Sequence, residues 1–292
     1  MKKNVKLSAS DIVQLLGWRG LTAVITLWSQ RDRRRLPAAI TEARYGALPR
    51  ERLDVIEPAI AGPAVPIVFI HGGAWVCGQK EQYYSPLAAF VQAGFRIFNV
   101  EYPRAPEDPH PQPLRSLLGA LAWIRARGIE RVQLVGDSAG GNLAMMLGIL
   151  MANDALQEVG LTAGALELPQ VVSIVSLYGV LERDVIVADG FPGGKLFLKA
   201  YSPASSEAGA IGSRITPMEL LPFDALPRTL IAAGNEDRLV RSSRIAAEAL
   251  RHRFGGHVTY TEYAGADHGF FQFGARSDEL RRDVTQFLLD VT

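Results

Sequence analysis

Short apolar runs bounded by turn-forming residues alternate along the chain with longer stretches of helical periodicity. The short runs are rich in β-branched residues and predict buried strands at residues 66–70, 96–100, 131–135, 171–177, 229–233 and 257–263. An alternating polar and apolar stretch predicts an edge strand at residues 52–56. Helical spacing predicts helices at residues 84–93, 114–126, 142–151, 241–254 and 277–289. This rhythm indicates the α/β class, with a mostly parallel central sheet flanked by helices.

Two segments depart from this rhythm within what we predict to be a single domain, residues 1–292. Near the N-terminus, Ser8 and Asp11 suit a capping box, and the apolar positions that follow recur at helical spacing. The second segment, at about residues 179–222, is long and contains several glycines and prolines. Long insertions of this kind commonly form lids. We predict a helical cap contributed by about residues 1–45 and 179–222. For the N-terminal helices, simple packing against the main domain remains an equal alternative.

Charge and cysteine content limit the classes of partner. The chain has 31 basic and 30 acidic residues, which gives no electrostatic reason to expect nucleic acid or an anionic membrane. No apolar run is expected to be long enough to cross a bilayer, and we predict no stable membrane insertion. The single cysteine, Cys77, excludes an internal disulfide and favours a cytoplasmic location. The oligomeric state is not fixed by the sequence, which leaves a homodimer open.

The pentapeptide at residues 136–140 places Ser138 between glycines, in the pattern G-x-S-x-G. An apolar strand is predicted before it and an apolar helix after it, as in the nucleophile elbow of α/β hydrolases. A serine hydroxyl at this turn is exposed to a substrate, but it needs a base and an acid to become a nucleophile. We predict Ser138 as the catalytic nucleophile.

The base and the acid are predicted from chain order and from the ends of strands. Asp237 follows the predicted strand 229–233, and His268 follows the strand 257–263. Carboxyl ends of parallel strands are where α/β folds build their sites. Glu236 and Asp267 are competing carboxylates. The competing histidines are His71, His110, His252 and His257.

Glycines after the strand 66–70 predict an oxyanion hole, since they let backbone N–H groups approach a substrate. We predict that the N–H groups of Gly72, Gly73 and Ala139 form it. Aromatic side chains near this loop and in the predicted cap are expected to bind substrate. They are Trp75, Phe191, Phe197 and Tyr201.

Together these motifs resemble the hormone-sensitive-lipase-like branch of the α/β-hydrolase superfamily, typified by bacterial carboxylesterases. The resemblance rests on residues 71–73, on residues 136–142, on Asp237 and on residues 267–270, with a further echo at Tyr102 and residues 105–109. Ala74 stands where the family has a third glycine, and Arg238 where it often has proline.

The resemblance implies a serine hydrolase that cleaves esters of small to medium apolar acyl groups through an acyl-enzyme, without a metal or cofactor. Its partner would be a small-molecule ester. An amidase-like or lactone-cleaving relative, such as an arylformamidase, is the alternative enzyme. A non-catalytic ligand-binding protein is the third reading, disfavoured because His268 is present.

Overall fold

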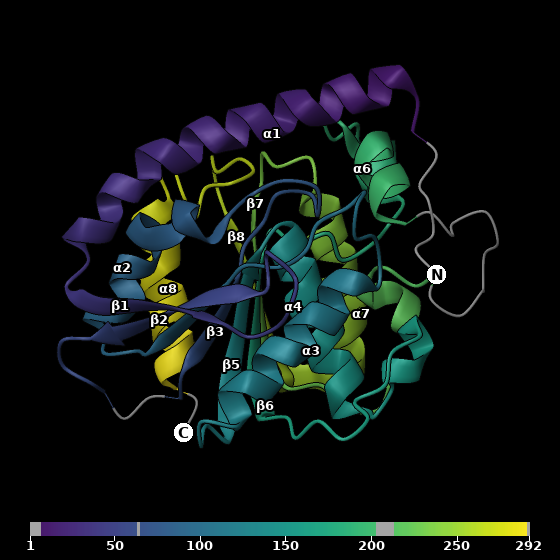
Figure 1. Ribbon diagram of the computed structural model, residues 1–292. Helices are drawn as coiled ribbons and strands as arrows, with labels where there is room; N and C mark the ends of the chain where they lie inside the picture. Colours follow the sequence, from purple (N-terminus) through teal and green to yellow (C-terminus); the bar gives the residue numbers. More distant parts are fainter. Residues whose placement is uncertain (1–6, 63–64, 203–212, 291–292) are drawn as a thin grey trace.

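Eight strands form one sheet in the order β1-β2-β4-β3-β5-β6-β7-β8 (Figure 1). The computed structural model describes residues 7–62, 65–202 and 213–290. Strands β1 and β2 are antiparallel to their neighbours, and all the other pairings are parallel. The strands are β1 (Ala38–Arg44), β2 (Arg52–Pro58), β3 (Ile67–Ile70), β4 (Ile97–Val100), β5 (Arg131–Asp137), β6 (Gln170–Leu177), β7 (Arg228–Gly234) and β8 (Val258–Tyr263).

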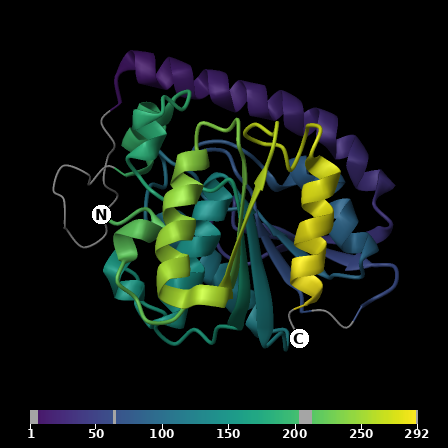
Figure 2. The ribbon, with the colours of Figure 1, turned by 180° about the vertical axis from the view of Figure 1, so that it is seen from behind.

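Helices cover both faces of this sheet (Figures 1 and 2). Helices α2 (Tyr84–Gln92) and α8 (Ser277–Leu289) pack on one face, and α3 (Gln112–Arg125), α4 (Ala139–Ala152) and α7 (Val240–Phe254) on the other. Side chains alternate along a strand, so β3 sends Val68 to one core and Phe69 to the other. Both faces of β3 are therefore buried, which is why its sequence is continuously apolar.

The predicted strands and helices are present, with ends shifted by a few residues, and the predicted fold class is confirmed. The prediction that residues 52–56 form an edge strand is wrong, because β1 pairs along the full length of β2. Strand β1 was not predicted. Its seven residues carry no apolar run, and its side chains are half-buried or exposed, as suits the true edge of the sheet.

Helix α1 (Ala9–Ser29) crosses the carboxyl edge of the sheet as the outermost element in both views (Figures 1 and 2). The predicted capping box is present: the Ser8 N–H donates to Asp11 Oδ2 at 2.8 Å, and the Asp11 N–H donates to Ser8 Oγ at 3.1 Å. A 3-10 helix, η1 (Gln30–Arg35), follows directly.

By length and composition, the stretch Ala9–Arg34 is long and apolar enough to span a bilayer. The sequence-based expectation that no stretch reaches that length is therefore wrong, although a core helix or a signal sequence passes the same test.

The segment from residue 179 contributes three short helical elements: α5 (Val185–Ala188), α6 (Gly194–Tyr201) and η4 (Pro217–Leu220). The first predicted cap segment, residues 1–45, extends too far along the chain, because residues 38–44 form β1 and belong to the sheet. Residues 1–6 and 203–212 of the predicted cap lie outside the described residues.

Candidate active site

Ser138 sits on a strained turn between β5 and α4, with φ 50° and ψ −118°. The turn is tight enough to need glycine on both sides. A Cβ on Gly136 would lie 2.3 Å from the carbonyl oxygen of Gly140, and a Cβ on Gly140 would lie 2.0 Å from that of Ile70. The Ser138 N–H donates to the Leu177 carbonyl at 2.8 Å, which ties the turn to β6. A positive φ at serine is costly and is found mainly where a site requires it.

His268 lies between Ser138 and Asp237. Its Nε2 is 3.0 Å from Ser138 Oγ, and its Nδ1 is 2.8 Å from Asp237 Oδ2. An ionised carboxylate only accepts hydrogen bonds, so Nδ1 carries the proton and Nε2 is left as the acceptor for the serine hydroxyl. The Leu239 N–H donates to Asp237 Oδ1 at 2.8 Å and fixes that carboxylate. The three predicted catalytic residues thus meet, although 130 positions separate Ser138 from His268.

The competing residues do not take the place of Asp237 or His268. Glu236 and Asp267 line the same cavity, but the Asp267 carboxylate accepts the backbone N–H of His268 and does not contact the ring. His252 and His257 are exposed. Burial lowers the pKa of His110 to about 3, so that ring is neutral inside the protein.

The oxyanion prediction needs one correction. The N–H of Gly72 is already donated to Asp137 Oδ1, at 2.7 Å, so it is not free for a substrate. In the described part of the chain, no hydrogen bond engages the N–H of Gly73 or Ala74, and both residues line the cavity beside Ser138. Ala139 begins α4, where a backbone N–H has no partner within the helix. The donors that remain available are therefore Gly73, Ala74 and Ala139.

The backbone N–H of Ala74 is an available hydrogen-bond donor that the sequence analysis did not include, because Ala74 was treated there only as a departure from the family's third glycine. It has φ 51°, a value that alanine tolerates only with strain. Gly73 has φ 120°, and a Cβ there would lie 2.2 Å from the Cys77 carbonyl oxygen, so this position requires glycine. Both positive φ values occur at consecutive residues of the loop that lines the cavity.

Asp137, the residue before the nucleophile, connects the turn at Ser138 with residues 71–74, the loop after β3 that we call the oxyanion loop. Besides the N–H of Gly72, its carboxylate accepts the hydroxyls of Tyr83 at 3.1 Å and Tyr178 at 3.4 Å. Burial raises the pKa of Asp137, and the hydrogen bonds from Tyr83 and Gly72 act against that rise. Nothing in the sequence around Tyr83 pointed to this role.

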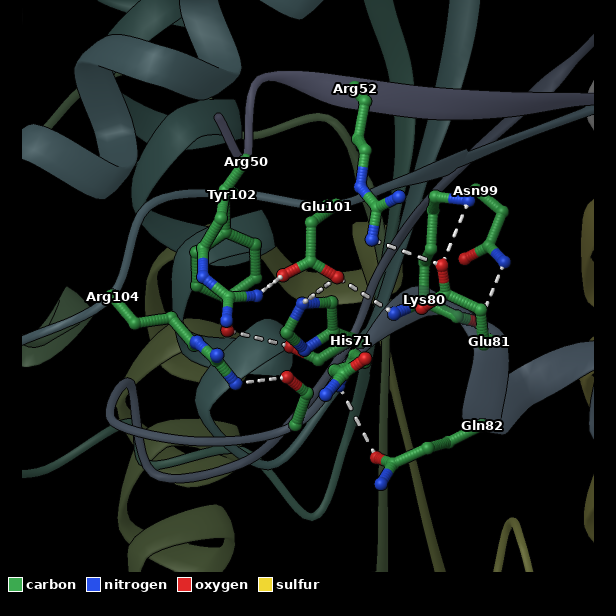
Figure 3. A network of polar contacts seen from close by, with 12 residues as sticks. Arg50, Arg52, His71, Lys80, Glu81, Gln82, Asn99, Glu101, Tyr102 and Arg104 are labelled. Carbon is green, nitrogen blue, oxygen red and sulfur yellow. Dashed lines mark hydrogen bonds and ion pairs between the residues drawn. The ribbon is translucent and has the colours of Figure 1, made fainter. Parts of the chain in front are cut away.

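A second polar network holds the strand end before the loop (Figure 3). The Tyr102 hydroxyl donates to the carbonyl of His71 at 2.8 Å. The carboxylate of Glu101 lies 3.6 Å from His71 Nε2, is paired with Arg50 at 2.6 Å, and accepts the backbone N–H of Lys80 at 3.0 Å. Burial acts to raise the pKa of Glu101, but the contacts with His71 and Arg50 outweigh it, so the pKa lies below its ordinary value. His71 is therefore a structural residue of the loop.

The cavity above Ser138 has a volume of about 710 Å³. Both segments of the predicted cap contribute to its wall, with Trp18, Leu21 and Ile25 from α1 and Phe191 and Phe197 from the insertion. The Phe191 ring meets His268 edge to face at a centroid distance of 4.9 Å. Phe197 meets Trp18 in the same manner at 5.7 Å. Two of the four predicted substrate-binding aromatics therefore line the cavity.

The other two, Trp75 and Tyr201, do not line it, and that prediction is wrong. Their rings are fully buried and stack on one another at 4.4 Å, nearly parallel. Trp75 Nε1 donates to Asn142 Oδ1 at 3.3 Å, and the Asn142 amide donates to the carbonyls of Val180 and Ile215, each at 2.8 Å. These residues tie the insertion to α4 from beneath the cavity. Among the described residues, no group of three His, Cys, Asp or Glu side chains could hold a metal ion.

Comparison with known proteins places this geometry in context. A family model described as alpha/beta hydrolase fold (Abhydrolase_3) matches residues 67–272. The chain is 29% identical to the esterase LipC of Mycobacterium tuberculosis, over 85% of this chain but only 64% of LipC. It is 27% identical to the carboxylesterase NlhH of the same species, covering 78% of this chain and 74% of NlhH. Esterase B of Lactobacillus rhamnosis has a similar fold, with a TM-score of 0.79 at 19% identity, covering 98% of this chain and 96% of that structure.

Proposed function

The chain belongs to the Abhydrolase_3 family of the α/β-hydrolase fold, in its hormone-sensitive-lipase-like branch, and we propose that it is a serine carboxylesterase. The observation that carries this proposal is the position of His268, within hydrogen-bonding distance of both Ser138 and Asp237. A nucleophile, a base and a group that orients the base are the parts that acyl transfer by serine requires.

In the first half of the reaction, Ser138 Oγ attacks the ester carbonyl while His268 Nε2 takes the hydroxyl proton. Asp237 holds the ring by accepting the Nδ1 proton and stabilises the imidazolium that forms. The negative charge on the carbonyl oxygen is met by the N–H groups of Gly73, Ala74 and Ala139. Preorganised donors of this kind are each worth about 10²–10³ in rate.

Collapse of the tetrahedral intermediate breaks the bond to the alcohol, and His268 returns its proton to the departing oxygen. A water molecule then attacks the acyl-serine while His268 takes one of its protons. Collapse of this second intermediate breaks the bond between the acyl carbon and Ser138 Oγ, His268 returns the proton to that oxygen, and the acid is released. No step requires a metal or a cofactor.

We expect the enzyme to prefer small to medium apolar acyl groups. The cavity is about 710 Å³ in volume, with Trp18, Phe191 and Phe197 on its wall. Apolar walls with few polar groups favour the binding of an apolar acyl chain. We expect p-nitrophenyl esters of graded chain length to give the highest kcat/KM at short and medium chains.

The test is a serine-to-alanine pair. Ser138→Ala should lower kcat/KM for p-nitrophenyl butyrate by about 10⁴-fold or more and abolish labelling by a fluorophosphonate probe. Ser173→Ala is the matched control, because Ser173 is also a buried serine but bonds Gln133 within the sheet. Ser173→Ala should keep both ester turnover and labelling by the fluorophosphonate probe. Ester turnover retained by Ser138→Ala would refute the proposal, and faster turnover of an N-formyl aromatic amine than of the ester would favour the amidase-like alternative.

A further inference from the structure

The long helix α1 buries polar side chains beside apolar ones and leaves a row of large apolar side chains exposed. Its protein-facing side holds the polar Arg19, Thr22 and Thr26 and also the apolar Leu15, Trp18 and Ile25, all buried or half-buried. Arg19 donates to the carbonyls of Val76 and Ala105, at 3.0 and 2.8 Å, and is paired with Glu107. A surface helix normally buries its apolar stripe and shows its charges to water.

The outward side of α1 is apolar and carries no charge between Ile12 and Leu27. Val13, Val24 and Leu27 are 69%, 64% and 68% exposed. Their spacing of three and eleven residues places them on one face, since eleven residues make about three turns. The other large apolar side chains described as exposed on the helix are Ile12, Leu16 and Leu21, and the polar Gln14 is exposed as well. Nothing in the described chain covers this row, and a contiguous apolar surface of this kind marks an interaction site.

Basic side chains flank the row at both ends. Beyond its C-terminal end, η1 exposes Arg31, Arg33 and Arg34, with Asp32 as the only acidic residue in that stretch. Beside its N-terminal end, Lys195 and Lys199 of α6 are exposed, with Lys199 paired to Asp11 at 2.6 Å (Figure 1). The nearly neutral total charge of the chain conceals this local arrangement.

We propose that the outward face of α1 docks in the plane of an anionic lipid bilayer. An apolar helix face with basic side chains at its margins is the pattern that binds the boundary between headgroups and acyl chains. The inward position of Arg19, halfway along the helix, opposes a membrane-spanning arrangement, which would place that guanidinium in hydrocarbon.

A second copy of the chain fits this face less well than lipid does. Both ends of the row carry basic side chains, so parallel and antiparallel pairing each bring like charges together, whereas anionic headgroups neutralise them. A single projecting helix also offers a narrow ridge, which a bilayer can accept along its whole length (Figures 1 and 2). Leu21 and Ile25 of the same helix line the cavity above Ser138, so the docked helix would separate the cavity from the lipid only by its own width.

The test measures sedimentation of the full chain with vesicles of phosphatidylcholine, with and without phosphatidylserine. Binding should require phosphatidylserine and should be lost at high salt. Val24→Glu, and separately the double change Arg33→Glu with Arg34→Glu, should each lower the bound fraction about tenfold or more. The control is Ile60→Glu, because Ile60 is 84% exposed in the turn before β3, at the opposite edge of the sheet. It should bind as the wild type does.

Other outcomes overturn the proposal. No binding to phosphatidylserine vesicles, or equal binding by Val24→Glu, would refute it. Protein that resists extraction by alkaline carbonate would indicate a spanning helix. A dimer in light scattering that Val24→Glu dissociates, without vesicle binding, would assign the face to a second copy. The proposal is separable from the esterase assignment, since Val24→Glu should hydrolyse water-soluble p-nitrophenyl butyrate normally and Ser138→Ala should still bind vesicles.

Discussion

Replacing Gly140 by alanine tests whether close contact between α4 and β3 sets the geometry of the oxyanion hole. The added Cβ would lie 2.0 Å from the carbonyl oxygen of Ile70 and 2.6 Å from that of His71. Both are backbone atoms at the end of β3, directly before the oxyanion loop, so neither can rotate away. Restoring an ordinary contact of about 3.4 Å requires the start of α4 to move away from the loop by more than about 1 Å.

That displacement separates Ser138 and the Ala139 N–H from the N–H groups of Gly73 and Ala74. A misplacement of about 1 Å costs about 10²-fold in rate, which is close to 2.7 kcal/mol of transition-state stabilisation. Overpacking should also lower the free energy of unfolding by about 1–3 kcal/mol. We therefore expect Gly140→Ala to fold, to unfold at a lower temperature, and to lose at least about 100-fold in kcat/KM.

Gly148→Ala is the control, on the same helix. Its Cβ would meet side chains and no backbone: it would lie 2.3 Å from Cδ1 and 2.8 Å from Cγ1 of Ile174, and a side chain can change rotamer. Turnover of p-nitrophenyl butyrate should be measured for both variants and normalised to the folded fraction from circular dichroism. Wild-type kcat/KM in folded Gly140→Ala, or an equal loss in Gly148→Ala, would refute the idea that this contact positions the site.

Three further predictions concern the surroundings of the site. Trp75→Ala should lower the free energy of unfolding by about 3–5 kcal/mol in urea titrations and leave KM for short esters nearly unchanged, because Trp75 is buried packing; a KM effect without a stability effect would restore it to the binding site. Tyr83→Phe leaves the Asp137 carboxylate short of a donor, so kcat should fall while the helices keep their circular dichroism, and an unchanged kcat would argue against that link. The hydrogen bond from Lys199, with those from Ser8, lowers the pKa of Asp11 from 3.8 to about 2. The contribution of the Asp11 carboxylate to the stability of α1 is therefore fully present above about pH 3.8 and is lost as the pH falls toward 2. Hydrogen exchange in α1, corrected for intrinsic rates, should rise over that window in the wild type, whereas Asp11→Asn should already exchange faster at higher pH.

Much of the fold and the candidate triad followed from local patterns. Buried parallel strands must be apolar on both faces, so their runs were visible in the sequence. The nucleophile turn requires glycine at fixed offsets, and this spacing identified Ser138 directly. Chain order and strand ends then indicated Asp237 and His268, because parallel strands bring their carboxyl ends to one edge.

Other features depended on which side of a residue faces which neighbour. The sequence could not indicate that the Gly72 N–H donates to the Asp137 carboxylate, because only folding brings this carboxylate from the end of β5 to that amide. Nor could it show that Trp75 faces inward, toward Tyr201, since aromatic residues serve cores and pockets equally well.

The orientation of α1 shows this division most clearly. The sequence predicted one or two helices near the N-terminus, through helical spacing and the capping box at Ser8, and the structure has one, Ala9–Ser29. Which face turns inward was decided by partners distant in the chain, among them Glu107, which binds Arg19, and Lys199, which binds Asp11. Local sequence specifies backbone hydrogen bonding within a few residues, whereas the direction of a face depends on contacts that exist only after the chain has folded.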